Sequence, residues 1–242
     1  VQPGEGVTTI ETGDRVVSLL TNACGRCERC QNGREHRCLY GEGIGHGRDG
    51  GFAEFVALSE FSLVRLPKNM DLTGAALLAC PMGVALQAIQ DVAQVKPGET
   101  TVVTGAGGGL GIHGLQIAAV LGSRVLAVTT SEDKLGRFAS LGAEEILHTG
   151  ELDFSEMVLA LTEDEGAGVV FDTVGSALFS STWRSLAQFG RLVLLGEVAG
   201  KAVELNLAEI IFRDARILGS SGVSRAVIER VVDLVSHGQV LP

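Results

Sequence analysis

From residue 96 onward, the chain alternates between two hydrophobic patterns. Apolar runs of three to six residues are followed by longer stretches whose apolar residues recur every three or four positions. Short buried strands that alternate with helices are typical of an α/β fold with a doubly wound parallel sheet. The pattern predicts six strands, at Thr100–Thr104, Arg124–Thr129, Glu145–Leu147, Val169–Asp172, Arg191–Leu195 and Ile217–Gly219.

Helix signals separate these strands. We expect one helix at Leu110–Leu121, which Gly122 ends, and a second that begins at Ser131–Asp133 and ends at Leu141–Gly142. A last helix is expected at Arg225–His237, where valine and isoleucine residues share one face.

The segment before residue 82 has a different pattern. β-like pieces at Arg15–Leu20 and Phe52–Leu58 lie on either side of a glycine-rich stretch, Gly41–Gly51, and a helical stretch at Thr73–Leu78 leads toward the sheet. We therefore expect a partial, mainly β domain at 1–81, the doubly wound domain at 82–222, and a helix at 223–242 that returns toward the first domain.

Composition narrows the classes of function. The 242 residues are 45% hydrophobic and 20% charged, as in globular proteins. A formal net charge of −10 opposes binding to nucleic acid. No apolar run reaches the roughly 18 residues that cross a bilayer. We expect neither a nucleic acid nor a membrane partner.

Four of the five cysteines, Cys24, Cys27, Cys30 and Cys38, follow the spacing C-x2-C-x2-C-x7-C. Such short links let several sulfurs of one segment converge on one tetrahedral zinc ion. Disulfides would suit a small secreted scaffold with an even number of cysteines. A bacterial iron–sulfur run would place its fourth cysteine after three residues and follow it with proline, whereas Leu39 follows here. The spacing predicts a closed structural zinc site, and thiols kept free for zinc imply the cytoplasm.

A glycine-rich turn lies between the first predicted strand and the first predicted helix. Glycines there let the backbone approach a pyrophosphate, which the amides of the helix N-terminus would bind. We expect dinucleotide binding, hence a Rossmann domain, with contacts from Gly105, Gly108, Gly109, Leu110 and Gly111.

The end of the second predicted strand bears on which dinucleotide binds. An NAD enzyme typically has an acidic residue there for the ribose 2′-hydroxyl. This strand ends instead in hydroxyl residues, Thr129, Thr130 and Ser131. With Lys134 they form a set suited to a 2′-phosphate, which favours NADP(H) over NAD(H). Alternatively, Glu132 or Asp133 bonds the ribose and Lys134 is only a solvated helix residue.

The order of these features resembles the medium-chain dehydrogenase/reductase superfamily, in its zinc-containing alcohol dehydrogenase type. The resemblance covers nearly the whole chain. Five further motifs carry it: Gly13–Val16, Gly50–Phe55, Cys80, Phe171–Gly175 and Gly190–Val193.

The resemblance implies roles that the spacing alone does not. It implies a GroES-like first domain, and a cofactor whose ribose and nicotinamide lie along Thr173, Val174, Leu195 and Gly196. Cys80 would be one ligand of a second, catalytic zinc; the alternative is a small buried apolar residue. Relatives are often dimers or tetramers, so we expect a homo-oligomer.

The chain also departs from the family pattern. Family members usually supply the other catalytic zinc ligands from an N-terminal cysteine and a Gly-His-Glu motif that precede the Gly13 region. Val1 lies past both positions, and Pro242 comes before the usual closing strands. We expect a fragment with an incomplete catalytic domain, in which no catalytic residue is assigned with certainty.

Three functions follow from these expectations. The first is an NADP(H)-dependent oxidoreductase that transfers hydride between nicotinamide and a small alcohol or carbonyl substrate. The second is an enoyl-thioester reductase of the acryloyl-CoA type, which the stretches Thr129–Glu132 and Ile217–Arg225 resemble. The third is a truncated, non-catalytic NADP(H)-binding module.

Overall fold

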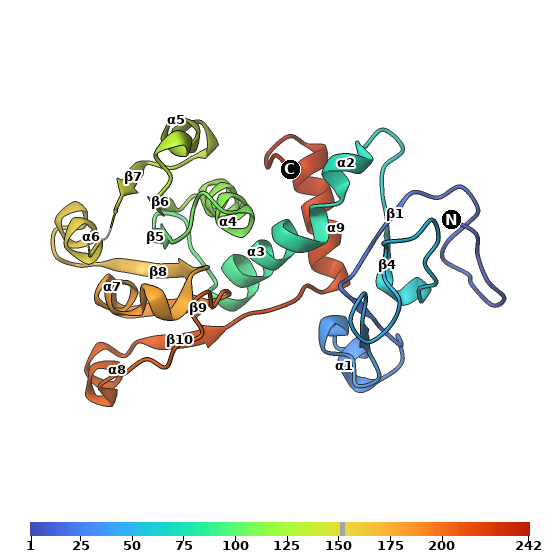
Figure 1. Cartoon of the computed structure of the whole chain (residues 1–242), viewed down its shortest axis with the longest axis horizontal. Helices are drawn as coiled ribbons and strands as arrows, with labels where there is room; N and C mark the ends of the chain where they lie inside the picture. The colour runs from blue at the N-terminus through green and yellow to red at the C-terminus, as the bar shows by residue number, and fades with distance from the viewer. Residues whose placement is uncertain (151–152) are drawn as a thin grey trace. The chain divides into compact units, whose positions relative to one another are not determined.

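The computed structural model describes residues 1–150 and 153–242, which divide into two compact units (Figure 1). Unit 1 comprises Val1–Val84 and Gly222–Pro242, and unit 2 comprises Ala85–Ser221. The described residues include no helix with the length and apolar character needed to cross a membrane.

Unit 2 is built on a parallel sheet of six strands in the order β10-β9-β8-β5-β6-β7. The strands are β5 (Thr100–Val103), β6 (Arg124–Thr129), β7 (Glu145–His148), β8 (Ala167–Asp172), β9 (Leu186–Leu194) and β10 (Arg216–Gly219). The predicted doubly wound sheet is confirmed. β9 begins earlier than predicted because Leu186 pairs with Ala167 ahead of an irregularity in the register. The order of the strands reverses beside β5, and ligands of such sheets bind at the carboxyl ends next to that point.

Apolar side chains of the central strands and the covering helices form the core of unit 2. Val102, Leu126, Val170 and Leu192 come from four neighbouring strands and are fully buried, as is Phe154 in front of α6. Because both faces of the sheet are covered, its central strands consist of nearly continuous aliphatic residues.

Helices of unit 2 connect these strands. They are α4 (Gly109–Val120), α5 (Leu135–Phe138), α6 (Ser155–Leu161), α7 (Phe179–Arg184) and α8 (Leu207–Arg213), with a 3-10 turn at Gly175–Ala177 ahead of α7. The π-helical residues Gln87–Val92 come before the first strand of the sheet.

The helix predicted from Ser131 to Leu141 is wrong as a single element. α5 has 3-10 turns on both sides, Glu132–Lys134 and Ala139–Leu141. Gly136 lies within this stretch and weakens a helix interior. Gly142 ends it with a φ of 102°.

Unit 1 contains short elements. Its antiparallel pairs are β1 (Val16–Ser18) with β4 (Leu63–Arg65), and β2 (Thr21–Asn22) with β3 (Glu42–Gly43). Its helices are α1 (Glu28–Gln31), α2 (Leu72–Ala75) and α9 (Arg225–Ser236), with 3-10 turns at Glu35–Arg37 and Glu60–Ser62 and a π-helical stretch at Leu78–Gly83. α3 (Val84–Leu86) is where the chain passes into unit 2.

α9 is the longest element of unit 1 and confirms the last predicted helix. Ser224 caps it, since its Oγ accepts a hydrogen bond from the Val227 backbone N–H (3.4 Å). Val227, Ile228 and Val231 are buried, and the helix packs against β4 and the π-helical stretch.

Two predictions for unit 1 need correction, and one strand was not predicted. Phe52–Leu58 is irregular rather than β, and Phe52 and Phe55 are exposed, because no described segment pairs with this stretch to complete a ladder. β4 was missed because three residues are too few for an alternating pattern. The helix predicted at Thr73–Leu78 lies instead at α2, because Asp71 caps its start by accepting a hydrogen bond from the Gly74 N–H (2.8 Å).

Candidate functional site

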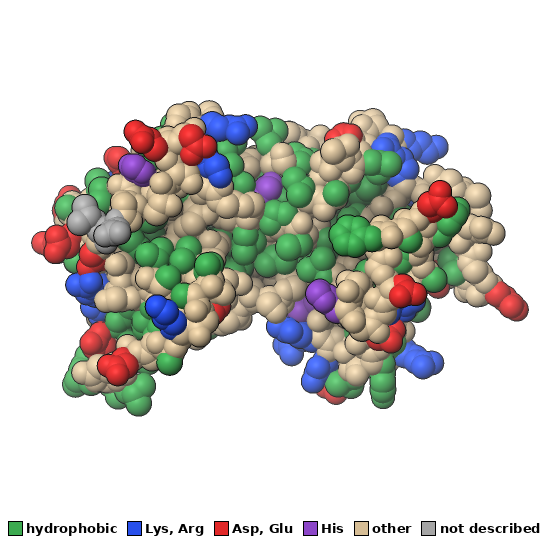
Figure 2. Space-filling model, in the orientation of Figure 1, with side chains coloured by type: hydrophobic (Ala, Val, Ile, Leu, Met, Phe, Trp, Pro, Cys, Tyr) green, Lys and Arg blue, Asp and Glu red, His purple; other side chains and the backbone are tan. Residues whose placement is uncertain are grey.

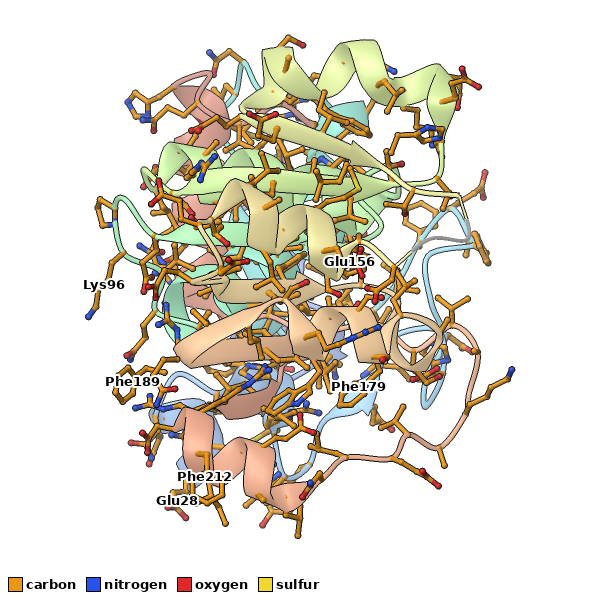
Figure 3. All side chains as sticks on the ribbon, turned by 90° about the vertical axis from the view of Figure 1, so that its left-hand side faces the viewer. Glu28, Lys96, Glu156, Phe179, Phe189 and Phe212 are labelled. Carbon is orange, nitrogen blue, oxygen red and sulfur yellow. The ribbon has the colours of Figure 1, made fainter. Side chains whose placement is uncertain are left out.

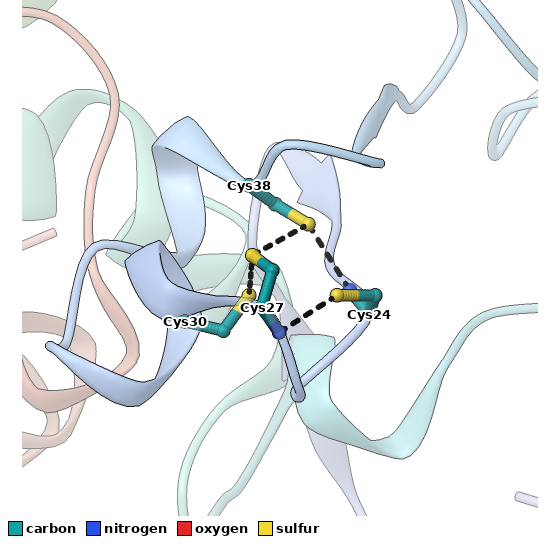
Figure 4. Close-up of side chains that lie close together, drawn as sticks. All are labelled: Cys24, Cys27, Cys30 and Cys38. Carbon is teal, nitrogen blue, oxygen red and sulfur yellow. Dashed lines mark hydrogen bonds between the residues drawn. The ribbon is translucent and has the colours of Figure 1, made fainter.

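The four predicted zinc ligands converge in a loop of unit 1 (Figure 4). Cys27 precedes the first residue of α1, Cys30 lies on α1, and Cys38 follows the Glu35–Arg37 turn. All four sulfurs, that of Cys24 included, lie within 4.8 Å of one another.

Distances between the sulfurs fit one tetrahedral ion. The Cys27 sulfur lies 3.5 Å from that of Cys30 and 3.8 Å from that of Cys38. Zinc–sulfur bonds of about 2.3 Å require sulfurs roughly 3.8 Å apart, whereas a disulfide requires about 2.0 Å. The arrangement therefore fits four thiolates around zinc.

The surroundings of the four thiols differ. Hydrogen bonds from backbone amides, first that of Cys30 and then that of Leu39, lower the pKa of Cys27 to about 6. The Arg26 amide likewise lowers the pKa of Cys24. Burial instead raises the pKa of Cys30 to about 12. A divalent cation would be needed to hold all four as thiolates, because it strongly favours the deprotonated form.

Cys80 lies outside this cluster, in the π-helical stretch of unit 1. It borders a cavity of about 310 Å³ that is lined by residues of β1 and α2. The residue is exposed, so the alternative that it is a small buried apolar residue is wrong. Desolvation by neighbouring atoms still raises the pKa of its thiol. Within the described ranges, only Cys24, Cys27, Cys30 and Cys38 bring three or more metal-binding side chains together, so a zinc at Cys80 stays a prediction.

In unit 2, the glycine turn connects β5 to α4 as predicted. Gly105 has a φ of 60°, and a Cβ on Gly111 would lie 2.2 Å from the Gly105 carbonyl oxygen, so both positions require glycine. Gly108 precedes α4 and provides no side-chain cap. Because glycine has no side chain to cap the helix, the first backbone amides of α4, at Gly109 and Leu110, can donate hydrogen bonds to a phosphate.

On one side of this turn lie the hydroxyl residues that end β6. A Cβ on Gly107 would lie 3.3 Å from the hydroxyl oxygens of Thr129 and Ser131 and 3.2 Å from Lys134 Cδ. The Lys134 ammonium donates a hydrogen bond to the Gly107 carbonyl (2.7 Å). Lys134 is thus packed on the turn and is not only a solvated helix residue. Thr130 follows at the strand end and is exposed.

On the other side lie the predicted nicotinamide residues. A Cβ on Gly105 would lie 2.5 Å from Thr173 Oγ1 and 3.2 Å from Val174 Cγ2. A Cβ on Gly196 would lie 2.0 Å from the Thr173 carbonyl oxygen. The backbone N–H of Leu195 donates to the Asp172 carbonyl (2.9 Å). The thirteen predicted cofactor residues thus lie at or after the carboxyl ends of β5, β6, β8 and β9.

Asp172 organises this edge and was not predicted. It is fully buried, and its Oδ1 accepts hydrogen bonds from the Thr104 hydroxyl (2.6 Å) and from the backbone amides of Val174 (2.9 Å) and Gly175 (3.1 Å). Its Oδ2 has no partner among the described residues. A buried carboxylate is costly unless hydrogen-bonded. The sequence feature that could have indicated this role is an acidic residue at the end of an apolar strand.

Comparison with known proteins agrees with these two sites. Residues 109–237 match the zinc-binding dehydrogenase family, and residues 1–68 match the alcohol dehydrogenase GroES-like domain. Acryloyl-coenzyme A reductase of Sulfurisphaera tokodaii is 35% identical over 240 residues, which is 99% of this chain and 70% of that protein.

Solved structures show the same relationship. The crystal structure of an NAD-dependent alcohol dehydrogenase has a TM-score of 0.90 and 35% identity, and covers 99% of this chain and 70% of its own. A zinc-binding dehydrogenase of Sinorhizobium meliloti, solved bound to NADP, has a TM-score of 0.87 and 30% identity, with 100% and 71% covered. A third solved structure, the crystal structure of AibC, has a longer chain, and the match covers 65% of its length.

The fold, the cysteine cluster and the glycine turn agree with both family matches, which together cover most of the chain. The chain belongs to the medium-chain dehydrogenase/reductase superfamily, an enzyme family, in its zinc-containing, alcohol dehydrogenase-like branch of oxidoreductases.

Proposed function

We propose that this protein is an NADP(H)-dependent oxidoreductase that transfers hydride between nicotinamide and a small alcohol or carbonyl substrate. The observation that carries the choice of cofactor is the convergence of Thr129, Ser131 and Lys134 on Gly107. Two hydroxyls and an ammonium group beside a phosphate-binding turn suit a 2′-phosphate, whereas a carboxylate would repel it.

The chain's own residues have distinct roles in this proposal. The turn from Gly105 to Gly111 and the start of α4 bind the pyrophosphate, and the end of β6 binds the ribose phosphate. The ends of β8 and β9 orient the nicotinamide, which supplies the hydride when the cofactor is bound. The cysteine cluster holds a structural zinc, and its closed shell takes no part in the transfer.

Binding measurements test the cofactor directly. We expect the wild type to bind NADPH at least tenfold more tightly than NADH in fluorescence titrations. Lys134→Ala should weaken NADPH about tenfold, because a charge-assisted contact is lost, and leave NADH unchanged. Lys96→Ala removes the same charge from a lysine near the start of β5 (Figure 3) and should change neither affinity. A wild type that prefers NADH would refute the proposal.

A second candidate is an enoyl-thioester reductase, which the 35% identity to an acryloyl-coenzyme A reductase favours. Such a reduction delivers hydride to a polarised alkene. The zinc content of the protein separates the candidates. Two zinc ions per chain, one of them lost in Cys80→Ser, would support alcohol dehydrogenase chemistry, and a single zinc retained in that variant would support the reductase.

We further propose that the protein is a homo-oligomer joined through unit 2. β10 is an edge strand, and α8 exposes Leu207, Ile211 and Phe212. Figure 2 shows hydrophobic side chains gathered over α8, and Figure 3 shows Phe189 and Phe212 on the same side of the unit. An unpaired edge beside an apolar surface suits strand pairing with a second copy. Light scattering should give a dimer or tetramer, and Phe212→Lys should shift it toward monomer.

A further inference from the structure

The loops that follow β8 and β9 are joined by a carboxylate outside the predicted cofactor residues. Glu197 accepts four hydrogen bonds: at Oε2 from the Ser176 backbone N–H (2.8 Å), and at Oε1 from the Ser176 hydroxyl (2.5 Å) and the backbone amides of Ala199 (3.0 Å) and Gly200 (2.7 Å). The Lys201 N–H donates in turn to Ser176 Oγ (3.2 Å). One side chain thereby fixes the two loops to each other.

Backbone packing brings these loops as close as glycine allows. Gly175 has a φ of 81°, and a Cβ there would lie 2.6 Å from Glu197 Oε2 and 2.6 Å from the Gly196 carbonyl oxygen. The backbone N–H of Val198 donates to the Val174 carbonyl (3.0 Å). Hydrogen bonds and steric fit therefore specify the same arrangement.

The position of Glu197 gives this contact a purpose beyond stability. It follows Gly196 directly, and its partner Ser176 lies two residues after Val174. Both neighbours belong to the predicted nicotinamide set. The Ser176 hydroxyl, followed by the amides of Ser176 and Gly200, holds the pKa of Glu197 below its ordinary value, so the carboxylate is charged at neutral pH. Charged acceptors make the stronger hydrogen bonds, and an exposed loop held this way loses little entropy when a ligand binds.

We propose that Glu197 is a positioning residue for the nicotinamide half of the cofactor. Through Ser176 it sets the spacing between Thr173 and Val174 on one loop and Leu195 and Gly196 on the other. The inference rests on the proposed NADP(H)-dependent function and adds a determinant outside the glycine turn and the β6 end.

Two ligands separate the halves of the cofactor. NADPH carries both, whereas adenosine 2′,5′-bisphosphate carries only the phosphoadenosine half. Glu197→Ala should weaken NADPH about tenfold and leave adenosine 2′,5′-bisphosphate within about twofold. The fluorescence spectrum of bound NADPH should also move toward that of free NADPH, because the nicotinamide is no longer held.

Two milder variants and a control sharpen the measurement. Ser176→Ala removes the hydroxyl that donates to Glu197. Glu197→Gln replaces one acceptor oxygen with an NH2 group, which cannot accept from the N–H and O–H donors around it. Each variant should weaken NADPH binding about threefold. Glu204→Gln removes the same charge from an exposed carboxylate on the same segment and should have no effect.

Two results would contradict different claims. If the wild type binds both ligands and Glu197→Ala matches it for NADPH, or weakens both ligands equally, the positioning role is overturned while the cofactor assignment stands. If the wild type binds neither ligand, the proposed NADP(H) function itself is refuted.

Discussion

The two units of this protein are stabilised in different ways. Unit 2 has a six-stranded sheet and a core in which Val102, Leu126 and Phe154 are fully buried. Unit 1 has strands of two or three residues, and a cluster in its cysteine loop that consists of Ala23 and the cysteines themselves. Hydrophobic burial suffices to order a large sheet, whereas a short loop needs a cross-link.

This difference predicts that the units respond separately to damage. Metal loss should affect the cysteine loop, and core substitutions should affect the sheet. The chain provides a convenient reporter, because its one tryptophan, Trp183, lies in unit 2 and is buried. Trp183 fluorescence therefore follows unit 2 alone.

The largest expected effect is on the cysteine loop when zinc is removed. Structural zinc supplies roughly 10 kcal/mol or more in small zinc modules. Chelation, or Cys27→Ser, should therefore unfold the loop and let trypsin cleave after Arg29 and Arg34, whose side chains are exposed but whose backbone is held in the folded loop, while Trp183 fluorescence is unchanged. Mass spectrometry of the fragments locates the cuts.

A matched substitution controls for the loss of a thiol. Cys80→Ser removes the one cysteine outside the cluster and should leave the loop resistant to trypsin. A simultaneous change in Trp183 fluorescence on chelation would show that the units do not respond separately.

The next effect concerns the core of unit 2. Phe171 is fully buried on β8, and a Cβ on Gly114 of α4 would lie 2.5 Å from its ring. Phe171→Ala should lower the free energy of unfolding by about 3–5 kcal/mol, because it leaves a cavity. Urea denaturation followed by Trp183 fluorescence measures the loss, and zinc content should not change.

Phe189→Ala is the control, since it removes an equally large ring from a residue of unit 2 that is 65% exposed. We expect a change within about 0.5 kcal/mol. Similar losses for the two substitutions would contradict the view that burial is what stabilises unit 2.

Sequence patterns predicted unit 2 far better than unit 1, for a physical reason. Arg124–Thr129 was predicted to the residue because a buried strand bounded by turn residues has a strong local pattern. Phe52–Leu58 looked similar but is irregular, since a strand needs a partner that the local sequence does not specify.

The candidate sites show the same limit. Cysteine spacing is local, so the cluster could be predicted. The contact between Ser176 and Glu197 joins residues 21 positions apart, and neither belongs to a motif. The role of Asp172 likewise depends on Thr104, 68 positions away, which only the folded sheet brings within reach.

A smaller effect is expected at the cofactor edge. Thr129 is buried and faces the glycine turn, so Thr129→Asp should place a carboxylate where the 2′-phosphate would bind. We expect NADPH affinity to fall by about tenfold to a hundredfold, or roughly 1.4–2.7 kcal/mol, and NADH to become the preferred cofactor. Calorimetric titration with both cofactors measures the two affinities.

Ser140→Asp is the control, because it adds the same charge at an exposed position near the end of α5 and should leave the ratio of NADPH to NADH affinity unchanged. An unchanged ratio in Thr129→Asp would count against NADP(H).

The smallest effect tests whether charge adds to the burial that stabilises unit 2. Burial alone would raise the pKa of Glu99, but the hydrogen bond from Arg191 (2.6 Å), with that from the Lys96 amide, brings it below the ordinary value of 4.5. A lowered folded-state pKa gives stability that is complete above the unfolded value and is lost as the pH falls through the folded one. Glu99→Gln should therefore cost about 1 kcal/mol at pH 7, because solvent screens a partly exposed pair, and almost nothing at an acid pH below the folded-state pKa of Glu99. Glu144→Gln, whose partner Arg124 lies at 2.7 Å but whose side chain is 57% exposed, should cost less than about 0.5 kcal/mol at either pH. Urea midpoints from Trp183 fluorescence measure the stability cost of each substitution at both pH values. Equal costs at the two pH values for Glu99→Gln would mean that Glu99 contributes through packing rather than charge.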